Sequence, residues 1–167
     1  MNEIRINTAL TYDDDVIIGD MLAKVWNDKM KESDYDFIFQ YIKLFPAGHI
    51  IARQNNKPVA SSIAFPMDRK PSMDEFSATH PYDFFSIHGR LYYIHVIQVL
   101  PEFRNKGTGT RLLDRQITVA REKKCDFVTG FSIDKEISGW EKKGFKSTGE
   151  FGKYKNFGIV KWIEMKL

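Results

Sequence analysis

The chain has 167 residues, of which 43 % are hydrophobic and 14 % aromatic, enough for one domain with a hydrophobic core and too many for a disordered chain. Its 25 Lys and Arg against 22 Asp and Glu give a net charge of +3, too small an excess to indicate binding to nucleic acid. One cysteine, Cys125, excludes an intramolecular disulfide, the polar start does not resemble a signal peptide, and the longest apolar run, 91–100, is too short to span a membrane. We therefore expect a cytoplasmic protein with a single domain over residues 1–167 that binds no membrane.

The hydrophobic pattern predicts strands and helices along the chain, because apolar residues at every second position indicate strands and those spaced by three or four indicate helices. In chain order we expect a strand near 4–6, helices over 13–27 and 33–44, a hairpin of strands 49–53 and 58–65, a strand over 91–99, a helix over 107–123, a strand over 126–131, a short helix over 134–143, and two closing strands that begin at 145, the last over 158–165. This order predicts an α/β fold with a mixed sheet and a βαβ crossover between the strands over 91–99 and 126–131.

Residues 66–90 form a segment that is too long for an ordinary connection, and we expect it to shape a substrate pocket. A mobile surface excursion is the alternative. It is the less favoured one, because Phe76, Tyr82, Phe84 and Phe85 give the segment more aromatic residues than solvated linkers usually carry.

The stretch from Val99 to Thr110 lies between a predicted strand and a predicted helix, where backbone N–H groups and the helix dipole can hold an anion. Gly107 and Gly109 would let the main chain approach a phosphate, and Arg104 and Lys106 add positive charge. The stretch is neither a Walker loop nor a dinucleotide fingerprint, so a nucleotide triphosphatase or a dehydrogenase is poorly supported.

The pattern Arg104-x-x-Gly107-x-Gly109, after a strand that ends Val99-x-Pro101, resembles the acyl-CoA-binding motif of the GCN5-related N-acetyltransferases, the GNAT superfamily.

Further along the chain, the run Trp140-Glu141-Lys142-Lys143-Gly144-Phe145 looks like that family's C-terminal signature, and the element order is similar to the family fold. The resemblance covers nearly the whole chain.

The resemblance implies acetyl-CoA as the acyl donor. The backbones of Ile97, Gln98 and Val99 would pair with the pantetheine arm like an added strand. The amides of the following loop would bind the pyrophosphate; its residues are Arg104, Asn105, Lys106, Gly107, Thr108, Gly109 and Thr110. The plainer alternative is a tight strand-to-helix turn with a solvated basic face, and the side chains of Ile97 and Val99 are expected in the core.

Transfer of an acetyl group to an amine needs a base that takes a proton from the ammonium. His95 is the leading candidate for the base, since imidazole exchanges its proton near neutral pH, and Tyr93 on the same strand face could complete a proton path. A hydrogen-bonded core histidine is the alternative. Cys125 is expected to be an incidental thiol, because direct attack by the amine requires no nucleophilic cysteine.

Trp140 stands where many relatives carry the tyrosine that protonates the departing thiolate, and an indole N–H does not ionise usefully. Tyr154 or water could supply the proton instead, or the thiolate could leave unassisted. His80 and His88, with Asp83 between them, fit no zinc spacing, and we expect no metal.

These residues lead to one principal hypothesis: an N-acetyltransferase that moves an acetyl group from acetyl-CoA to a primary amine by direct attack on the thioester. The alternative is a catalytically silent acyl-CoA-binding module that regulates a partner protein. The sequence leaves the acceptor open among a polyamine, an aminoglycoside-like antibiotic, an amino acid, a protein N-terminus and a lysine. It also allows a homodimer formed by pairing of the closing strands.

Overall fold

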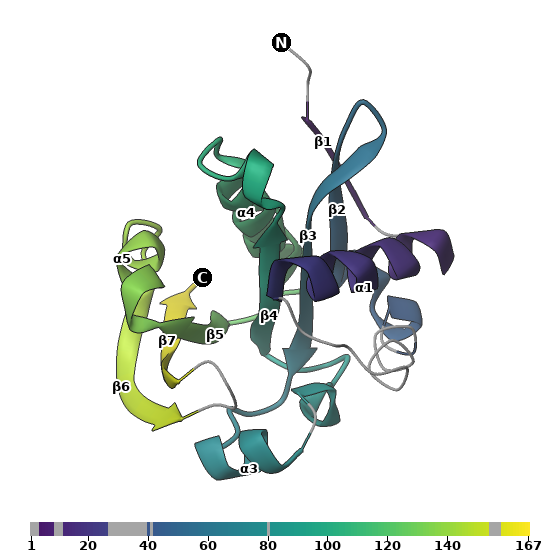
Figure 1. The fold of residues 1–167 in the computed structure, drawn as a ribbon. Helices are drawn as coiled ribbons and strands as arrows, with labels where there is room; N and C mark the ends of the chain where they lie inside the picture. The colour runs from purple at the N-terminus through teal and green to yellow at the C-terminus, as the bar shows by residue number, and fades with distance from the viewer. Residues whose placement is uncertain (1–3, 9–11, 27–39, 41, 80, 154–157) are drawn as a thin grey trace. The chain divides into compact units, whose positions relative to one another are not determined.

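The computed structural model describes residues 4–8, 12–26, 40, 42–79, 81–153 and 158–167 (Figure 1). The helices and strands in these ranges are β1 (Ile4–Thr8), α1 (Tyr12–Trp26), the 3-10 helix η1 (Pro46–Gly48), β2 (His49–Gln54), β3 (Lys57–Met67), α3 (Met73–Ala78), the 3-10 helix η2 (Pro81–Phe84), β4 (Leu91–Val99), the 3-10 helix η3 (Pro101–Phe103), α4 (Thr108–Glu122), β5 (Phe127–Ile133), α5 (Asp134–Glu141), β6 (Lys146–Lys153) and β7 (Ile159–Lys166).

The element bounds agree with the sequence-based prediction to within two residues wherever both can be compared. The predicted helix over 33–44 lies mostly outside the described residues, although residues 40 and 42–44 are helical. The structure differs from the prediction in the segment 66–90, which contains α3 and η2 in addition to loop. The local cause is a capping box: the Ser72 side chain accepts from the Glu75 amide, and the Glu75 side chain accepts from the Ser72 amide.

The strands follow the order β1-β2-β3-β4-β5-β7-β6 in a mixed seven-stranded sheet, counted over the described residues. The pairs β1/β2, β2/β3, β5/β7 and β6/β7 are antiparallel, whereas β4 and β5 are parallel. The parallel pairing over Leu91–Ile94 and Phe127–Gly130, with α4 between the two strands in the chain, confirms the predicted βαβ crossover. Among the described residues, no helix has the length and hydrophobicity that a membrane span requires.

Contacts within the chain define two units. The first unit comprises Met1–Ala64 and Val96–Val119, and the second comprises Phe65–His95 and Ala120–Leu167. Strands β3 and β4 therefore each contribute residues to both units, and the units are described here one at a time.

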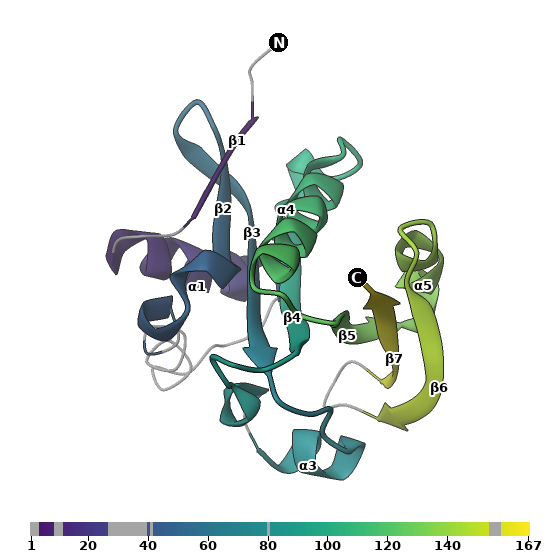
Figure 2. The same cartoon turned by 180° about the vertical axis from the view of Figure 1, so that it is seen from behind.

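In the first unit, two adjacent serines of β3 anchor two different helices. The Ser61 hydroxyl accepts a hydrogen bond of 2.7 Å from Gln98 Nε2, which also lies 3.3 Å from the Ile18 carbonyl of α1. The Ser62 hydroxyl accepts a bond of 2.8 Å from Gln116 Nε2 of α4. Because successive side chains of a strand point to opposite faces, α1 and α4 lie on opposite faces of β2 and β3 (Figures 1 and 2).

One apolar cluster of the first unit lies on the α4 side. Ile50, Ala52, Val59 and Ala60 of the hairpin are buried together with Leu112 of α4. The hairpin turn suits this packing, because Asn55 and Asn56 both adopt left-handed backbone conformations, with φ of 50° and 63°, that match the twist of two paired strands.

His49 at the start of β2 is fully buried and neutral. Its Nδ1 donates to the Phe45 carbonyl at 3.1 Å, and its Nε2 has no hydrogen-bond partner among the described residues. Burial lowers the pKa of His49 from 6.5 to about 4, because the charged imidazolium would lose its hydration there.

This burial predicts acid destabilisation of the first unit. Between pH 6.5 and 4 the unfolded chain binds a proton at His49 that the folded chain does not, so the free energy of unfolding falls as the pH drops through that window. The full loss is about 3 kcal/mol by linkage. Urea unfolding at a series of pH values measures it. The His49→Gln variant should lack this part of the pH dependence. The control His88→Gln, a change at an exposed histidine, should keep it. If the unfolding free energy has the same slope against pH in the wild type and both variants, the assignment to His49 is wrong.

Candidate active site

The loop that follows β4 is shaped by two residues with left-handed backbone. Asn105 has a φ of 60° and Gly107 a φ of 78°. The Arg104 side chain fixes the beginning of the turn, because its Nε donates to the Val99 carbonyl at 3.0 Å. A Cβ at position 107 would have no atom within 4 Å, so glycine is favoured there by its backbone conformation and not by lack of space.

The first turn of α4 presents backbone donors at the end of this loop. The Arg111 amide bonds the Gly107 carbonyl at 3.0 Å. The amides of Thr108, Gly109 and Thr110 precede it, and they have no carbonyl of the helix to bond. With the positive end of the helix dipole, these amides form a place where an anion can bind.

The Thr108 side chain is 1 % exposed, and its hydroxyl has no hydrogen-bond partner among the described residues. It therefore adds an uncommitted polar group to the same helix terminus.

At Gly109, α4 begins next to β4, with room for a Cβ in ordinary contact. A Cβ at this position would lie 3.6 Å from Val99 Cγ2 and 4.0 Å from Ile97 Cγ2. Ile97 and Val99 themselves pack, partly buried, against the hairpin core and Leu112. Their predicted place in the core is confirmed.

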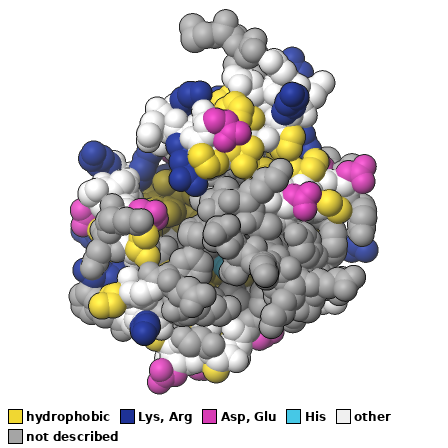
Figure 3. Space-filling model, viewed as in Figure 1, with side chains coloured by type: hydrophobic (Ala, Val, Ile, Leu, Met, Phe, Trp, Pro, Cys, Tyr) yellow, Lys and Arg dark blue, Asp and Glu magenta, His cyan; other side chains and the backbone are white. Residues whose placement is uncertain are grey.

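The cationic side chains around the loop are engaged with backbone carbonyls. Lys106 Nζ donates to the Glu102 carbonyl at 2.9 Å and lies 5.4 Å from the centre of the Phe103 ring. Arg111 Nη2 donates to the Ile4 carbonyl at 3.0 Å. Both Arg104 and Lys106 are exposed, so their positive charge lies at the turn, as predicted. On the face drawn in Figure 3, the described Lys and Arg side chains lie among acidic ones and form no single basic patch.

Two buried glutamines take part in positioning this region, and the sequence-based prediction missed this role. Gln98 was expected to contribute its backbone, and the structure shows its side chain joined to β3 and α1 through Ser61 and the Ile18 carbonyl. Gln116 holds α4 to Ser62 and to the Gly48 carbonyl, the latter at 2.9 Å. One signal of this role was present in the sequence: Gln116 is a polar residue on the apolar face of a predicted helix.

The second unit contains the candidate base. His95 is half-buried, Tyr93 is 2 % exposed, and the centroids of the two rings are 6.0 Å apart. The Tyr82 ring, from the segment 66–90, lies 5.7 Å from the His95 ring. His95 is therefore neither fully enclosed nor isolated, and aromatic rings form its surroundings.

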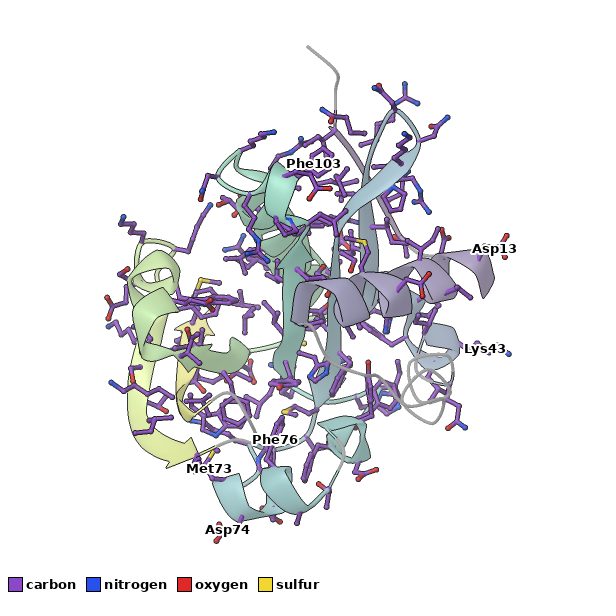
Figure 4. All side chains as sticks on the ribbon, viewed as in Figure 1. Asp13, Lys43, Met73, Asp74, Phe76 and Phe103 are labelled. Carbon is purple, nitrogen blue, oxygen red and sulfur yellow. The ribbon has the colours of Figure 1, made fainter. Side chains whose placement is uncertain are left out.

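Rings from the segment 66–90 pack onto the face of the second unit that carries Tyr93. Phe76 and Tyr82 are buried, which contradicts the mobile-excursion alternative for these residues. Phe76 lies 5.7 Å from Tyr93 and 4.5 Å from Phe131, both measured between ring centroids. Figure 4 shows Phe76 pointing from α3 toward the strands and Asp74 pointing away from them. We call the whole set the aromatic cluster: Phe65, Phe76, Tyr82, Phe84, Phe85, Tyr93, His95, Phe131 and Trp162.

A charged pair holds α3, and with it Phe76, in place. Arg69 donates to both carboxylate oxygens of Glu75, at 2.6 and 2.9 Å. These bonds, with the one from the Ser72 amide, lower the pKa of Glu75 to about 2, so this carboxylate stays ionised at neutral pH.

The remaining predicted residues fall in different places. Trp140 packs against Phe145 with ring centroids 5.0 Å apart. Cys125 is buried near the Gly89 carbonyl, and burial raises the pKa of its thiol, which disfavours a nucleophilic thiolate.

Tyr154 and His80 lie outside the described residues. Among the residues described, no group of three or more His, Cys, Asp or Glu side chains could hold a metal ion.

Comparison with known proteins places the chain in a family. Residues 12–136 match the Acetyltransferase (GNAT) family, which is well over half of the sequence. The chain belongs to this family. No curated protein matches the sequence significantly.

Several solved structures share the fold at low sequence identity. The loading GNATL domain of CurA from Lyngbya majuscula is 13 % identical, with a TM-score of 0.79 and coverage of 99 % of this chain and 98 % of that one. A chain of the NatC complex bound to Gag peptide and CoA is 16 % identical, with a TM-score of 0.75 and 99 % of each chain covered. The mosquito protein named arylalkylamine N-acetyltransferase like 5b is also 16 % identical, with a TM-score of 0.75 and coverage of 99 % of this chain and 100 % of that one. These similarities confirm the predicted mixed α/β fold of the GNAT type.

The two glycines of the loop should respond differently to alanine. Gly107→Ala places a Cβ on a left-handed backbone and should lower the free energy of unfolding by roughly 1–2 kcal/mol. Gly109→Ala adds a methyl group with ordinary contacts inside a helix, and it should leave that free energy unchanged or raise it by up to about 1 kcal/mol. Urea unfolding of both variants measures the difference. Equal losses in the two would show that the left-handed conformation of Gly107 is not what makes glycine necessary.

Proposed function

We propose that the chain is an acetyl-CoA-dependent N-acetyltransferase, a single domain over residues 1–167, that transfers an acetyl group to a primary amine. The observation that carries the proposal concerns the loop that follows β4. This loop, Arg104-x-x-Gly107-x-Gly109, leads into the N-terminus of α4, whose first amides have no helix carbonyl to bond, and the chain belongs to the GNAT family. The partners of this enzyme are acetyl-CoA and a small-molecule or peptide amine.

The cofactor would be held mainly by backbone. The amides from Arg104 to Thr110 would bind the pyrophosphate, since they surround the N-terminus of α4. The backbone of Ile97, Gln98 and Val99 would pair with the pantetheine arm. The packing of the Ile97 and Val99 side chains and the hydrogen bonds of the Gln98 side chain support this assignment, because they hold the strand backbone in one place.

In the reaction, acetyl-CoA supplies an acetyl group activated as a thioester. The nitrogen of the amine acceptor attacks the carbonyl carbon directly, the carbon–sulfur bond breaks, and a thiolate leaves. His95 takes the proton from the ammonium or from the attacking nitrogen, and Tyr93 on the same strand serves as the next member of the proton path. The half-buried position of His95 supports this role, because an imidazole that is only partly enclosed can exchange its proton.

Trp140 favours a second candidate function. It occupies the position where relatives with a tyrosine have a general acid, and its ring is packed against Phe145. If no other group supplies the proton, the chain would bind acyl-CoA and regulate a partner protein without catalysing transfer.

The two functions differ in a direct assay. Acetyl-CoA and a panel of primary amines should release free thiol above the rate without amine, and His95→Gln should lower kcat by about 10²- to 10⁴-fold with CoA affinity unchanged. His88→Gln is the matched control, since this histidine is exposed, and it should keep full activity. CoA binding without thiol release from any amine would favour the silent module, and full activity of His95→Gln would remove His95 as the base.

A further inference from the structure

The short helix η3, which joins β4 to the loop before α4, carries an aromatic ring in a fixed position. The amide of Phe103 donates to the Leu100 carbonyl at 2.8 Å, and the amide of Leu100 donates to the Val59 carbonyl of β3 at 3.0 Å. The Phe103 ring packs against the buried side chains of the β2–β3 hairpin and α4. Its backbone and part of its ring are therefore held in place, beside the loop that leads into α4 (Figure 4).

Phe103 differs in exposure from the other phenyl ring described in the first unit. Phe45 is 2 % exposed, whereas Phe103 is half-buried. Phe103 also directly precedes Arg104, the first residue of the loop to which we assign the pyrophosphate of the acyl donor. Among the phenyl rings described in this unit, it is therefore the one that keeps surface available next to that loop.

One flexible cation lies over this ring. Lys106 Nζ is 5.4 Å from the ring centre of Phe103 and donates to the Glu102 carbonyl at 2.9 Å. The Lys106 side chain is exposed, and an ammonium over a ring at an exposed site is held only weakly. The position of this ammonium shows that a nitrogen donor can lie over the Phe103 ring and reach the Glu102 carbonyl at the same time.

A base with an amino group at its edge has the chemistry that this place requires. Adenine is flat and aromatic, so it can stack on a phenyl ring, and its 6-amino group is an N–H donor. In an acyl-CoA one ribose joins the base to the pyrophosphate, so the two groups bind to neighbouring parts of a protein. Stacking of a base on an aromatic side chain strengthens binding roughly 5- to 100-fold, which exceeds the contribution of the exposed Lys106 contact.

The charges around η3 favour the phosphates and do not oppose the base. Residues 101–111 include three cations, Arg104, Lys106 and Arg111, and one carboxylate, that of Glu102. The Glu102 side chain is exposed, and adenine is uncharged at neutral pH, so this carboxylate does not repel it. A Lys106 ammonium that leaves the ring stays near the loop, where it adds to the attraction for phosphate.

We infer that the adenine of the acyl-CoA stacks on the Phe103 ring, in the place that Lys106 Nζ occupies in the free protein, and that its 6-amino group donates to the Glu102 carbonyl. The inference rests on the proposed binding of an acyl-CoA and adds a base-recognition site to it. Phe103 and the Glu102 carbonyl select the base, and Lys106 turns from the ring toward the phosphates.

The experiment measures the affinity of three ligands by calorimetric titration. They are CoA, desamino-CoA, in which an oxygen replaces the 6-amino group, and 4′-phosphopantetheine, which lacks the nucleoside. Phe103→Leu should weaken CoA binding about tenfold and leave the affinity for 4′-phosphopantetheine unchanged, because only CoA carries the base. Phe103→Tyr keeps a ring and should keep both affinities. The wild type should bind desamino-CoA about fivefold more weakly than CoA.

Ile6→Ala is the matched control for lost packing. Ile6 also packs, partly buried, against the side chains on which Phe103 rests, so this variant should be less stable to urea but keep the ratio of the CoA and 4′-phosphopantetheine affinities. If Phe103→Leu does not fold, NMR of the wild-type complex tests the same contact. We expect nuclear Overhauser effects between the adenine protons and the Phe103 ring.

The outcomes separate this inference from the proposed function. Equal losses of affinity for CoA and 4′-phosphopantetheine in Phe103→Leu, or no Overhauser effect between the base and the ring, overturn the stacking while acyl-CoA binding stands. Equal binding of desamino-CoA and CoA to the wild type overturns the hydrogen bond to the Glu102 carbonyl. A wild-type protein that binds no CoA overturns the proposed function and this inference together.

Discussion

The alternation of Ser61 and Ser62 on β3 is the constraint around which the first unit is built. One hydroxyl faces α1 and the other faces α4, and each receives the Nε2 hydrogen of a buried glutamine. Breaking such a bond leaves a buried polar group without a partner, at a cost of roughly 1–3 kcal/mol, so the two helices are held at defined places on the strand. The N-terminus of α4, where we propose that the pyrophosphate binds, is fixed as a consequence.

The second unit is held together differently, because aromatic rings make up much of its interior. Rings from β3, the segment 66–90, β4, β5 and β7 meet there, most of them edge to face or tilted, which is an arrangement that aromatic quadrupoles favour. The segment 66–90 takes part through Phe76, Tyr82, Phe84 and Phe85. Its capping box and the Arg69–Glu75 pair give this segment a local structure of its own, so its rings are presented in fixed positions.

Each unit, taken by itself, carries one of the groups that the proposed function uses. The first contains backbone amides at a helix terminus, and such donors would suit a pyrophosphate because they are fixed before an anion binds. The second contains His95, with the Tyr82 ring 5.7 Å from its own. In the proposed reaction the described residues offer no evident proton donor for the departing thiolate, because Trp140, packed against Phe145, stands where the family resemblance leads one to expect a tyrosine.

Much of this architecture follows from local sequence, and the reasons are specific. β4 and α4 were predicted closely because a run of β-branched and aromatic residues ends at Pro101 and an amphipathic helix follows. The Arg104-x-x-Gly107-x-Gly109 loop could be recognised because its expected role depends on the backbone freedom of glycines that lie within six consecutive residues. The helix α3 was not predicted, because its six residues lie in a segment whose Pro, Ser and Asp content is typical of a loop.

The sequence by itself determined the order of the elements, the family and the position of the Arg104-x-x-Gly107-x-Gly109 loop, since each depends on residues close together in the chain. Only the tertiary structure decided that Gln98 and Gln116 are buried bridges, that Tyr82 of segment 66–90 lies beside His95, and that Lys70 lies over Trp162, which is 92 positions away in the sequence. Those relations depend on distances between residues far apart in the chain, and no local pattern specifies such a distance.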